Sequence, residues 1–149
     1  MKTVGSGIHL TEAGASDAAY LYALVEQTMR GYVETTWGEW READTRDTLS
    51  KAAAGGRYSL IHAGDQLVGA VCVQRHRTHV QLEQLYVAPE HQRRGIGTAI
   101  VRNILAEAAS LKLPVRLRVL AINPAHKLYA RLGFVVTGST PERLYMEHP

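Results

Sequence analysis

Apolar residues recur along the chain at two spacings, and these spacings predict the helices and the strands. Residues 18–30 and 96–111 carry an apolar side chain every three or four positions, which is the period of a helix with one buried face. Residues 41–54 are more polar, and we expect them to form an exposed second helix. A short fourth helix is expected over residues 125–132. Because glycine often follows the last turn of a helix, we expect Gly31 to end the first one.

Short apolar runs between turn residues predict the strands. Two runs on either side of Gly64 and Asp65 are typical of an antiparallel hairpin. A later strand alternates apolar residues with Arg116 and Arg118, so the two arginines should share one face. The seven expected strands lie at residues 8–10, 57–62, 67–73, 80–87, 115–120, 134–136 and 144–146.

The composition is that of an ordinary globular protein. The chain has 149 residues, of which 46% are hydrophobic and 21% charged, so we expect one domain over residues 1–149 with a substantial core. The net charge of +3 is modest and mixed along the chain, which argues against a nucleic-acid partner. Seven histidines are scattered without the spacing of metal ligands, and we expect no metal.

The single cysteine and the lack of long apolar runs predict the cellular compartment of the protein. The single cysteine, Cys72, cannot form an internal disulfide, and we expect it to be a small buried hydrophobe in a reducing compartment. Neither the N-terminal residues nor any later segment approaches the roughly eighteen apolar residues of a membrane span. We therefore expect a soluble cytoplasmic protein with no membrane partner.

A glycine-rich turn at residues 92–98 precedes a predicted helix and has the features of a phosphate site. Gly95 and Gly97 let the backbone approach a bulky anion, and the N–H groups at a helix start point toward such an anion. Arg93 and Arg94 add positive charge there. The alternative is an ordinary strand-to-helix loop with solvated arginines. The spacing fits neither a Walker loop nor a dinucleotide fingerprint.

An aromatic and acidic stretch, residues 32–40, holds both tryptophans of the protein. Its glutamates could attract a cationic group that the indole faces receive through cation–π contact, so the stretch is a candidate binding pocket. Equally, the tryptophans could anchor a loop between two helices on the core while the glutamates stay exposed. The candidate substrate-binding residues in this stretch are Glu34, Trp37, Glu39 and Trp40.

Two sequence motifs together resemble the GCN5-related N-acetyltransferase (GNAT) superfamily. One is Gln-x-x-Gly-x-Gly from residue 92, and the other is Asn-Pro-Ala-x-x-Leu-Tyr-x-x-Leu-Gly-Phe from residue 123. Their order, the helix and strand between them and the preceding Leu-Tyr-Val-Ala-Pro-Glu run extend the resemblance over residues 8–147. It implies an α+β or α/β fold, with a mixed, mostly antiparallel central sheet of six to seven strands flanked by about four helices.

The resemblance implies that acetyl-CoA is the co-substrate and that the turn wraps its pyrophosphate. The strand before the turn would pair with the pantetheine arm and offer a backbone N–H to the thioester carbonyl. Asn123 would contact the pantetheine side, unless it simply caps the next helix. The implied cofactor-binding residues are Leu85, Tyr86, Val87, Gln92, Arg93, Arg94, Gly95, Ile96, Gly97, Thr98 and Asn123.

Two residues are candidates for proton transfer. By the resemblance Tyr129 is the general acid, since a phenol beside the leaving sulfur can protonate a thiolate; the alternative is a tyrosine that only packs its ring. Glu83 is the first candidate for the general base, because it lies on the strand leading to the expected acetyl site. Its alternative is a solvated strand glutamate. Where some relatives that acetylate protein N-termini carry a glutamate, this chain offers Arg118, which argues against that substrate class.

The resemblance implies an N-acetyltransferase that works by direct transfer in a ternary complex. We expect the acceptor to be a primary amine of a small molecule or a peptide, bound against the acidic and aromatic stretch. The alternative is a non-catalytic module of the same fold that binds or senses acyl-CoA. The last strands and the second helix offer a face that a homodimer could use.

Overall fold

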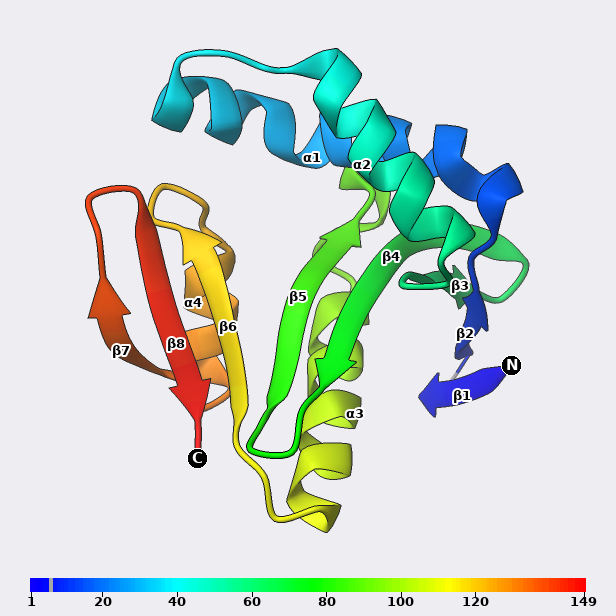
Figure 1. The fold of residues 1–149 in the computed structure, drawn as a ribbon. Coiled ribbons are helices and arrows are strands. Elements are labelled where there is room, and N and C mark those ends of the chain that lie inside the picture. The colour runs from blue at the N-terminus through cyan, green and yellow to red at the C-terminus, as the bar shows by residue number, and fades with distance from the viewer. Residues whose placement is uncertain (6) are drawn as a thin grey trace. The chain divides into compact units, whose positions relative to one another are not determined.

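The elements of the fold are defined by a computed structural model, which describes residues 1–5 and 7–149 (Figure 1). The strands in these residues are β1 (Lys2–Gly5), β2 (Ile8–Glu12), β3 (Ser59–Ala63), β4 (Gln66–Arg75), β5 (Val80–Val87), β6 (Val115–Leu120), β7 (Val135–Ser139) and β8 (Arg143–His148). The α-helices are α1 (Ala18–Trp37), α2 (Glu42–Ala54), α3 (Ile96–Ser110) and α4 (Ala125–Arg131), and two short 3₁₀ helices are η1 (Ala15–Asp17) and η2 (Pro89–His91). The last three α-helices are confirmed to within one residue of their expected ends.

The strands form a sheet in the order β1-β2-β3-β4-β5-β6-β8-β7. Strands β5 and β6 pair in parallel, and the pairs β1–β2, β2–β3, β3–β4, β6–β8 and β7–β8 are antiparallel. The expected mixed, mostly antiparallel sheet is confirmed. The described residues form eight strands, so the expected six to seven is wrong, and β1 is the strand that was missed. Its Lys-Thr-Val-Gly sequence has little apolar pattern, and its pairing with β2 is what makes it a strand.

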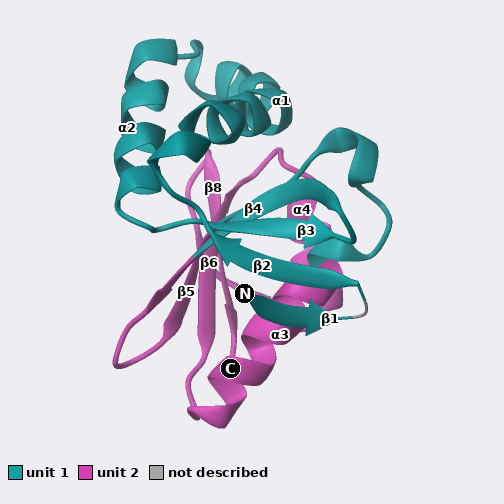
Figure 2. Cartoon of the chain, turned by 90° about the vertical axis from the view of Figure 1, so that its right-hand side faces the viewer, with its two compact units in different colours: residues 1–72, 84–97 teal, residues 73–83, 98–149 magenta. Residues whose placement is uncertain are grey.

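The chain divides into two compact units, which Figure 2 colours separately. Unit 1 comprises residues 1–72 and 84–97, so it holds α1, α2, strands β1 to β3, most of β4 and the end of β5. Unit 2 comprises residues 73–83 and 98–149, with α4, strands β6 to β8 and nearly all of α3. The expectation of a single domain over the whole chain stays a prediction.

Helix α1 of unit 1 extends beyond Gly31, the residue that was expected to end it. An ion pair at helical spacing spans the glycine, since Arg30 lies 3.5 Å from Glu34, and Arg30 also lies 2.9 Å from Glu26 in the preceding turn. The helix ends before Gly38 instead, whose φ of 88° is left-handed and whose N–H donates to the Glu34 carbonyl at 2.8 Å. The expectation of an end at Gly31 is therefore wrong, and much of the stretch after it is helical.

Replacing Gly31 with alanine is expected to raise the free energy of unfolding by about 0.5–1 kcal/mol. The residue is exposed inside a helix, and a Cβ there would meet nothing within 4 Å. Urea unfolding followed by circular dichroism measures the change. Gly38→Ala is the matched control and should destabilise, because a left-handed residue with a Cβ is strained. Loss of stability in the Gly31 variant would contradict a continuous α1.

The core of unit 1 is formed by one face of each of its two long helices and by strand residues. Leu21 and Leu24 of α1 and Leu49 of α2 are at most 5% exposed and belong to one apolar cluster with Leu60 of β3. Cys72 belongs to the same cluster, which confirms that it is buried. Because the apolar faces of α1 and α2 are buried, their polar faces point away from the core, and residues on these polar faces form part of the candidate active site.

In unit 2, strand β6 alternates as expected. Val115 and Leu117 are buried, while Arg116 and Arg118 are exposed on the other face. Arg116 is paired across the strands with Glu147 of β8 at 3.1 Å. None of the helices in the described residues has the length and apolar character needed to cross a membrane.

Candidate active site

The glycine-rich turn of unit 1 is exposed and contains two left-handed residues. Arg93 has a φ of 64° and Gly95 a φ of 81°, while Gln92 before them is extended. Left-handed residues in a short turn direct backbone N–H groups into a shared concavity, which is a common way of binding an anion. A left-handed arginine costs on the order of 1–2 kcal/mol, and such strain collects at functional sites. The backbone of the turn therefore suits an anion.

The side chains of the turn suit an anion as well. Arg93 and Arg94 are exposed, and a Cβ placed on Gly95 would meet nothing within 4 Å. Helix α3 begins directly afterwards with buried Ile96 and half-buried Gly97. The start of a helix adds partial positive charge to that of the two guanidinium groups.

The side chain of Gln92 ties the turn to the end of β5. Its Nε2 donates a hydrogen bond to the Val87 carbonyl oxygen at 2.9 Å. One residue further on, the Ala88 N–H donates to the Val68 carbonyl of β4 at 2.8 Å. The amide of Gln92, expected to contact the cofactor, is thus used at least in part to position the strand end.

A close backbone approach between β4 and β5 also fixes this strand end. A Cβ at Gly69 would overlap the carbonyl oxygen of Tyr86 and lie 3.2 Å from the Val87 Cα, so the position requires glycine. Tyr86 is 7% exposed, and its hydroxyl donates to Oε1 of Gln84 at 2.8 Å. Leu85 between them is half-buried. The expected pantetheine-binding residues therefore lie on a strand end that is held from several sides.

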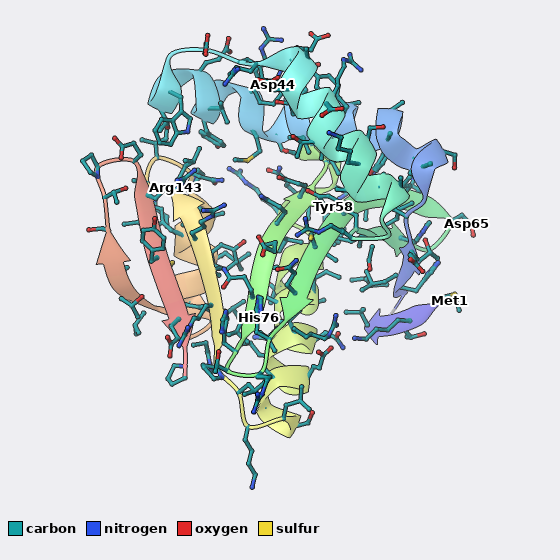
Figure 3. The ribbon with its side chains drawn as sticks, viewed as in Figure 1. Met1, Asp44, Tyr58, Asp65, His76 and Arg143 are labelled. Atoms are coloured by element: carbon teal, nitrogen blue, oxygen red, sulfur yellow. The ribbon has the colours of Figure 1, made fainter. Side chains whose placement is uncertain are left out.

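A pocket of about 540 Å³ lies in unit 1, a volume typical of small-molecule sites. Leu49, Tyr58 and Tyr86 are its buried members, each at most 7% exposed. Figure 3 labels two of the lining residues, Asp44 on α2 and Tyr58 before β3. The full lining is Val33, Trp37, Glu39, Trp40, Arg41, Asp44, Thr45, Thr48, Leu49, Tyr58, Gln84 and Tyr86.

The charged residues that line the pocket are two carboxylates and one guanidinium. Arg41 Nη2 lies 2.6 Å from Asp44 Oδ2, and Arg41 Nε lies 3.9 Å from Glu39 Oε1. The lining is therefore net negative, although the chain as a whole carries +3. Ion pairs this exposed contribute up to about 1 kcal/mol, so these charges can rearrange around a ligand at little cost.

The two tryptophans line the pocket and differ in how they are held. The half-buried Trp40 donates from Nε1 to the Tyr22 hydroxyl at 2.9 Å, and that hydroxyl donates to Glu26 at 3.1 Å. The guanidinium carbon of Arg46 lies 3.8 Å from the centre of the Tyr22 ring. Trp37, the last residue of α1, is 48% exposed. Trp40 thus anchors α1 and lines the pocket at once, so the two interpretations of the aromatic stretch are compatible.

Three of the four residues expected at the acceptor line this pocket, namely Trp37, Glu39 and Trp40. Glu34 does not line it and lies beside Arg30. The reason is helical geometry: Val33 and Trp37 are four positions apart and share a face of α1, whereas residue 34 is turned about 100° from residue 33. A role for Glu34 stays a prediction.

Several lining residues were not expected from the sequence, and four of them lie on α2. Asp44, Thr45 and Thr48 lie three, four and seven positions after Arg41, which is the spacing of one helix face. The sequence carries this signal only in polar residues, whereas the prediction of a helix rests on the spacing of apolar ones. Tyr58 comes from a distant segment, and nothing in its neighbourhood marks it as part of a site.

Tyr129 lies on α4 in unit 2 and is 7% exposed. Its ring meets Phe134 edge-on, with ring centres 5.7 Å apart. Burial raises the pKa of Tyr129 to about 12. The phenol therefore keeps its proton at physiological pH, as a general acid must, and is a weaker acid than an exposed tyrosine.

The other expected residues of unit 2 lie just before α4, on β5 and on α3. Oδ1 of Asn123 accepts a hydrogen bond from the Ala125 N–H at 2.9 Å, which supports the capping role at the start of α4. Glu83 is half-buried on β5, and Thr98 is half-buried in the first turn of α3. Within the described part of the chain, no three histidine, cysteine, aspartate or glutamate side chains are placed to hold a metal ion.

A family model identifies the class of protein. Residues 18–134 match the model described as acetyltransferase (GNAT) family, and the matched segment contains both the glycine-rich turn and Tyr129. The chain therefore belongs to the GNAT acetyltransferase family, which confirms the resemblance seen in the two motifs. No curated protein matches the chain.

Solved structures of similar fold include three acetyltransferases. PaiA N-acetyltransferase of Thermoplasma acidophilum, in complex with coenzyme A, is 16% identical with a TM-score of 0.72, covering 95% of this chain and 98% of its own. An acetyltransferase of Thermus thermophilus is 18% identical with a TM-score of 0.75, covering 95% and 96%. Naa50 of Arabidopsis thaliana, in complex with the bisubstrate analogue CoA-Ac-MVNAL, is 18% identical with a TM-score of 0.67, covering 96% and 99%. At these identities the likeness shows the fold alone.

Proposed function

We propose that this protein transfers the acetyl group of acetyl-CoA directly to a primary amine of a small molecule or a peptide. The observation that carries the proposal is that the glycine-rich turn and the aromatic, acidic pocket of unit 1 both border the end of β5. Gln92 of the turn bonds to Val87, and Gln84 and Tyr86 line the pocket. A donor bound at the turn and an acceptor bound in the pocket would meet at this strand, as a ternary complex requires.

The turn fits the phosphates of acetyl-CoA. Arg93 and Arg94 offer exposed guanidinium groups, which form charge-assisted hydrogen bonds with phosphate oxygens. The space next to the Cα of Gly95 is open, since a Cβ there would meet nothing within 4 Å. We assign residues 92–98 to the pyrophosphate and residues 85–87 to the pantetheine arm. When bound, acetyl-CoA supplies an acetyl group activated as a thioester.

The protein's own groups would polarise the reacting carbonyl and manage two protons. Backbone N–H groups at the end of β5 are the proposed donors to the carbonyl oxygen. We assign Tyr129 Oη to the leaving sulfur. Because the pKa of Tyr129 is about 12 and that of a thiol is near 8.5, the phenol favours donating a hydrogen bond over complete proton transfer.

The second proton belongs to the acceptor, because an alkyl ammonium has a pKa near 10.4 and must become neutral before it attacks. Glu83, half-buried on β5, is our candidate to accept this proton directly or through water. It precedes Gln84, which lines the pocket.

Two of the similar structures support nitrogen as the accepting atom. PaiA is described as an N-acetyltransferase and was solved with coenzyme A. The Naa50 structure holds a bisubstrate analogue written CoA-Ac-MVNAL. Family membership supports acetyl transfer, and these two structures of similar fold favour an amine as the proposed acceptor.

Thiol release from acetyl-CoA in the presence of primary amines tests the proposal. We expect release that depends on the acceptor, with an equal amount of acetylated amine detected by mass spectrometry. The panel should contain alkyl amines, aryl-alkyl amines and short peptides. Saturable acetyl-CoA binding without acceptor-dependent release would favour the alternative, a module that binds or senses acyl-CoA.

A further inference from the structure

The acidic side of the pocket is a local exception in a basic chain. Residues 26–47, which run from α1 into α2, hold six carboxylates and three arginines, whereas the whole chain has 14 acidic and 17 basic residues. Glu39 and Asp44 bring two of these carboxylates to the pocket, with side chains 69% and 62% exposed. Negative charge therefore gathers at a ligand-sized cavity, where it attracts cations.

These carboxylates do not assist the amine that reacts. An attacking amine must be neutral, and a carboxylate beside an ammonium favours the charged form and raises its pKa. An interaction that is lost when the proton leaves stabilises the unreactive state of the substrate. The carboxylates of the pocket therefore favour the reaction only if they bind a group that stays positively charged throughout acetyl transfer.

We propose that the pocket binds a second cationic group of the acceptor, separate from the primary amine that receives the acetyl group. The inference rests on the proposed function and specifies its substrate class, an amine joined by an apolar linker to an ammonium or guanidinium. A volume of about 540 Å³ exceeds that of an amine group and accommodates a linker as well. Gln84 and Tyr86 lie on β5, so the reacting amine belongs on that side and the second cation beside Glu39 and Asp44.

The aromatic lining suits the same ligand. Indole faces attract cations, and aromatic rings offer apolar surface to a linker. Trp40 already has a guanidinium nearby, since the Arg30 guanidinium carbon lies 6.0 Å from its ring centre. The hydrogen bond from Trp40 to Tyr22 at 2.9 Å holds this wall in place within the protein itself, which lowers the entropic cost of binding.

Arg41 is the protein's own cation at the acidic side. Its guanidinium lies between the two carboxylates, 2.6 Å from Asp44 and 3.9 Å from Glu39, and its side chain is 69% exposed. A bound cation would share these carboxylates with Arg41. Removing this competitor by Arg41→Gln should therefore tighten binding of a dicationic ligand about threefold, within the range of exposed ion pairs.

Tryptophan fluorescence measures occupancy of this pocket directly, because both tryptophans of the protein line it. The whole chain is titrated, with and without coenzyme A, with diamines of three, four and six carbons and with the monoamine of each length. Monoamines are more apolar, so a merely hydrophobic pocket would prefer them. We expect the diamines to bind about tenfold more tightly and their binding to weaken as salt rises.

Two variants assign the effect to the carboxylates. Glu39→Gln combined with Asp44→Asn should weaken diamine binding about tenfold and monoamine binding much less, because a monoamine brings only one positive charge to the pocket. Asp47→Asn is the matched control, because Asp47 is an exposed carboxylate of α2 that pairs with Lys51 and does not line the pocket. The kcat/KM for acetylation of the diamines should follow the same order.

The outcomes separate this inference from the proposed function. Equal binding of diamines and monoamines, or diamine binding that survives the double substitution, would overturn the second-cation site even if amines are acetylated. Carboxylate-dependent diamine binding without acetyl transfer to any amine would support the site and remove the proposed activity. Stronger diamine binding in the Arg41→Gln variant would further support the site.

Discussion

Replacing Tyr129 with phenylalanine should lower kcat for acetyl transfer about 100-fold and leave the KM for acetyl-CoA nearly unchanged. The substitution removes one hydroxyl from a ring that is 7% exposed and preserves its edge contact with Phe134. A group that helps only as the carbon–sulfur bond breaks contributes to kcat and not to binding. Steady-state kinetics with thiol detection measures both constants.

Comparing the wild type with the Tyr129→Phe variant as a function of pH tests whether the pKa of the buried phenol is raised. Burial raises the pKa of Tyr129 from 10 to about 12. A general acid works in its protonated form, so ionisation of Tyr129 should not reduce kcat near pH 10. Because the folded pKa is the higher one, the contribution to stability is complete below pH 10 and is lost as pH rises toward 12. Relative to the phenylalanine variant, the wild type should lose about 2–3 kcal/mol of unfolding free energy across that window.

A second tyrosine provides the control for Tyr129. Tyr145 of β8 is 37% exposed, and Tyr145→Phe should leave kcat unchanged. Equal kcat for the wild type and the Tyr129 variant, with the alkaline stability difference still present, would identify Tyr129 as a packing residue. That outcome would select the alternative that the sequence left open.

The sequence predicted best those elements whose burial follows local alternation. Strands β5 and β6 have their expected ends, because Val80 and Leu82 in one and Val115 and Leu117 in the other are buried at alternate positions. Strand β1 lacks this signal, since backbone pairing with β2 defines it. Likewise, α1 continues through Gly31, which the Arg30–Glu34 ion pair spans, so the local preference of glycine for a helix end did not decide where the helix stops.

The candidate site was predictable where its residues are adjacent in sequence and hidden where they meet only in the fold. The turn at residues 92–98 is one local segment, so its glycines and arginines could be recognised together. Tyr58 and Gln84 line the pocket from segments far apart in the chain. The raised pKa of Tyr129 arises from burial, which the residue type alone does not reveal.

Replacing both Arg93 and Arg94 with alanine should weaken acetyl-CoA binding about 150-fold with little change in kcat. Hydrogen bonds between charged groups contribute roughly 1.5–3 kcal/mol each, and the exposure of this turn favours the lower end. Calorimetric titration with acetyl-CoA at two salt concentrations measures the loss, and the variant should lose most of the salt dependence. Arg77→Ala, which removes an exposed charge between β4 and β5, should change neither.

A glycine at position 93 separates the charge of this residue from its backbone conformation. Arg93 has a φ of 64°, so Arg93→Gly should relieve strain and raise the free energy of unfolding by about 1 kcal/mol, whereas Arg93→Ala should not. If the guanidinium binds phosphate, both variants lose affinity for acetyl-CoA to a similar extent despite their different stabilities. If Arg93→Gly binds as tightly as the wild type, the backbone N–H groups hold the anion and the arginine is a solvated residue in a strained turn.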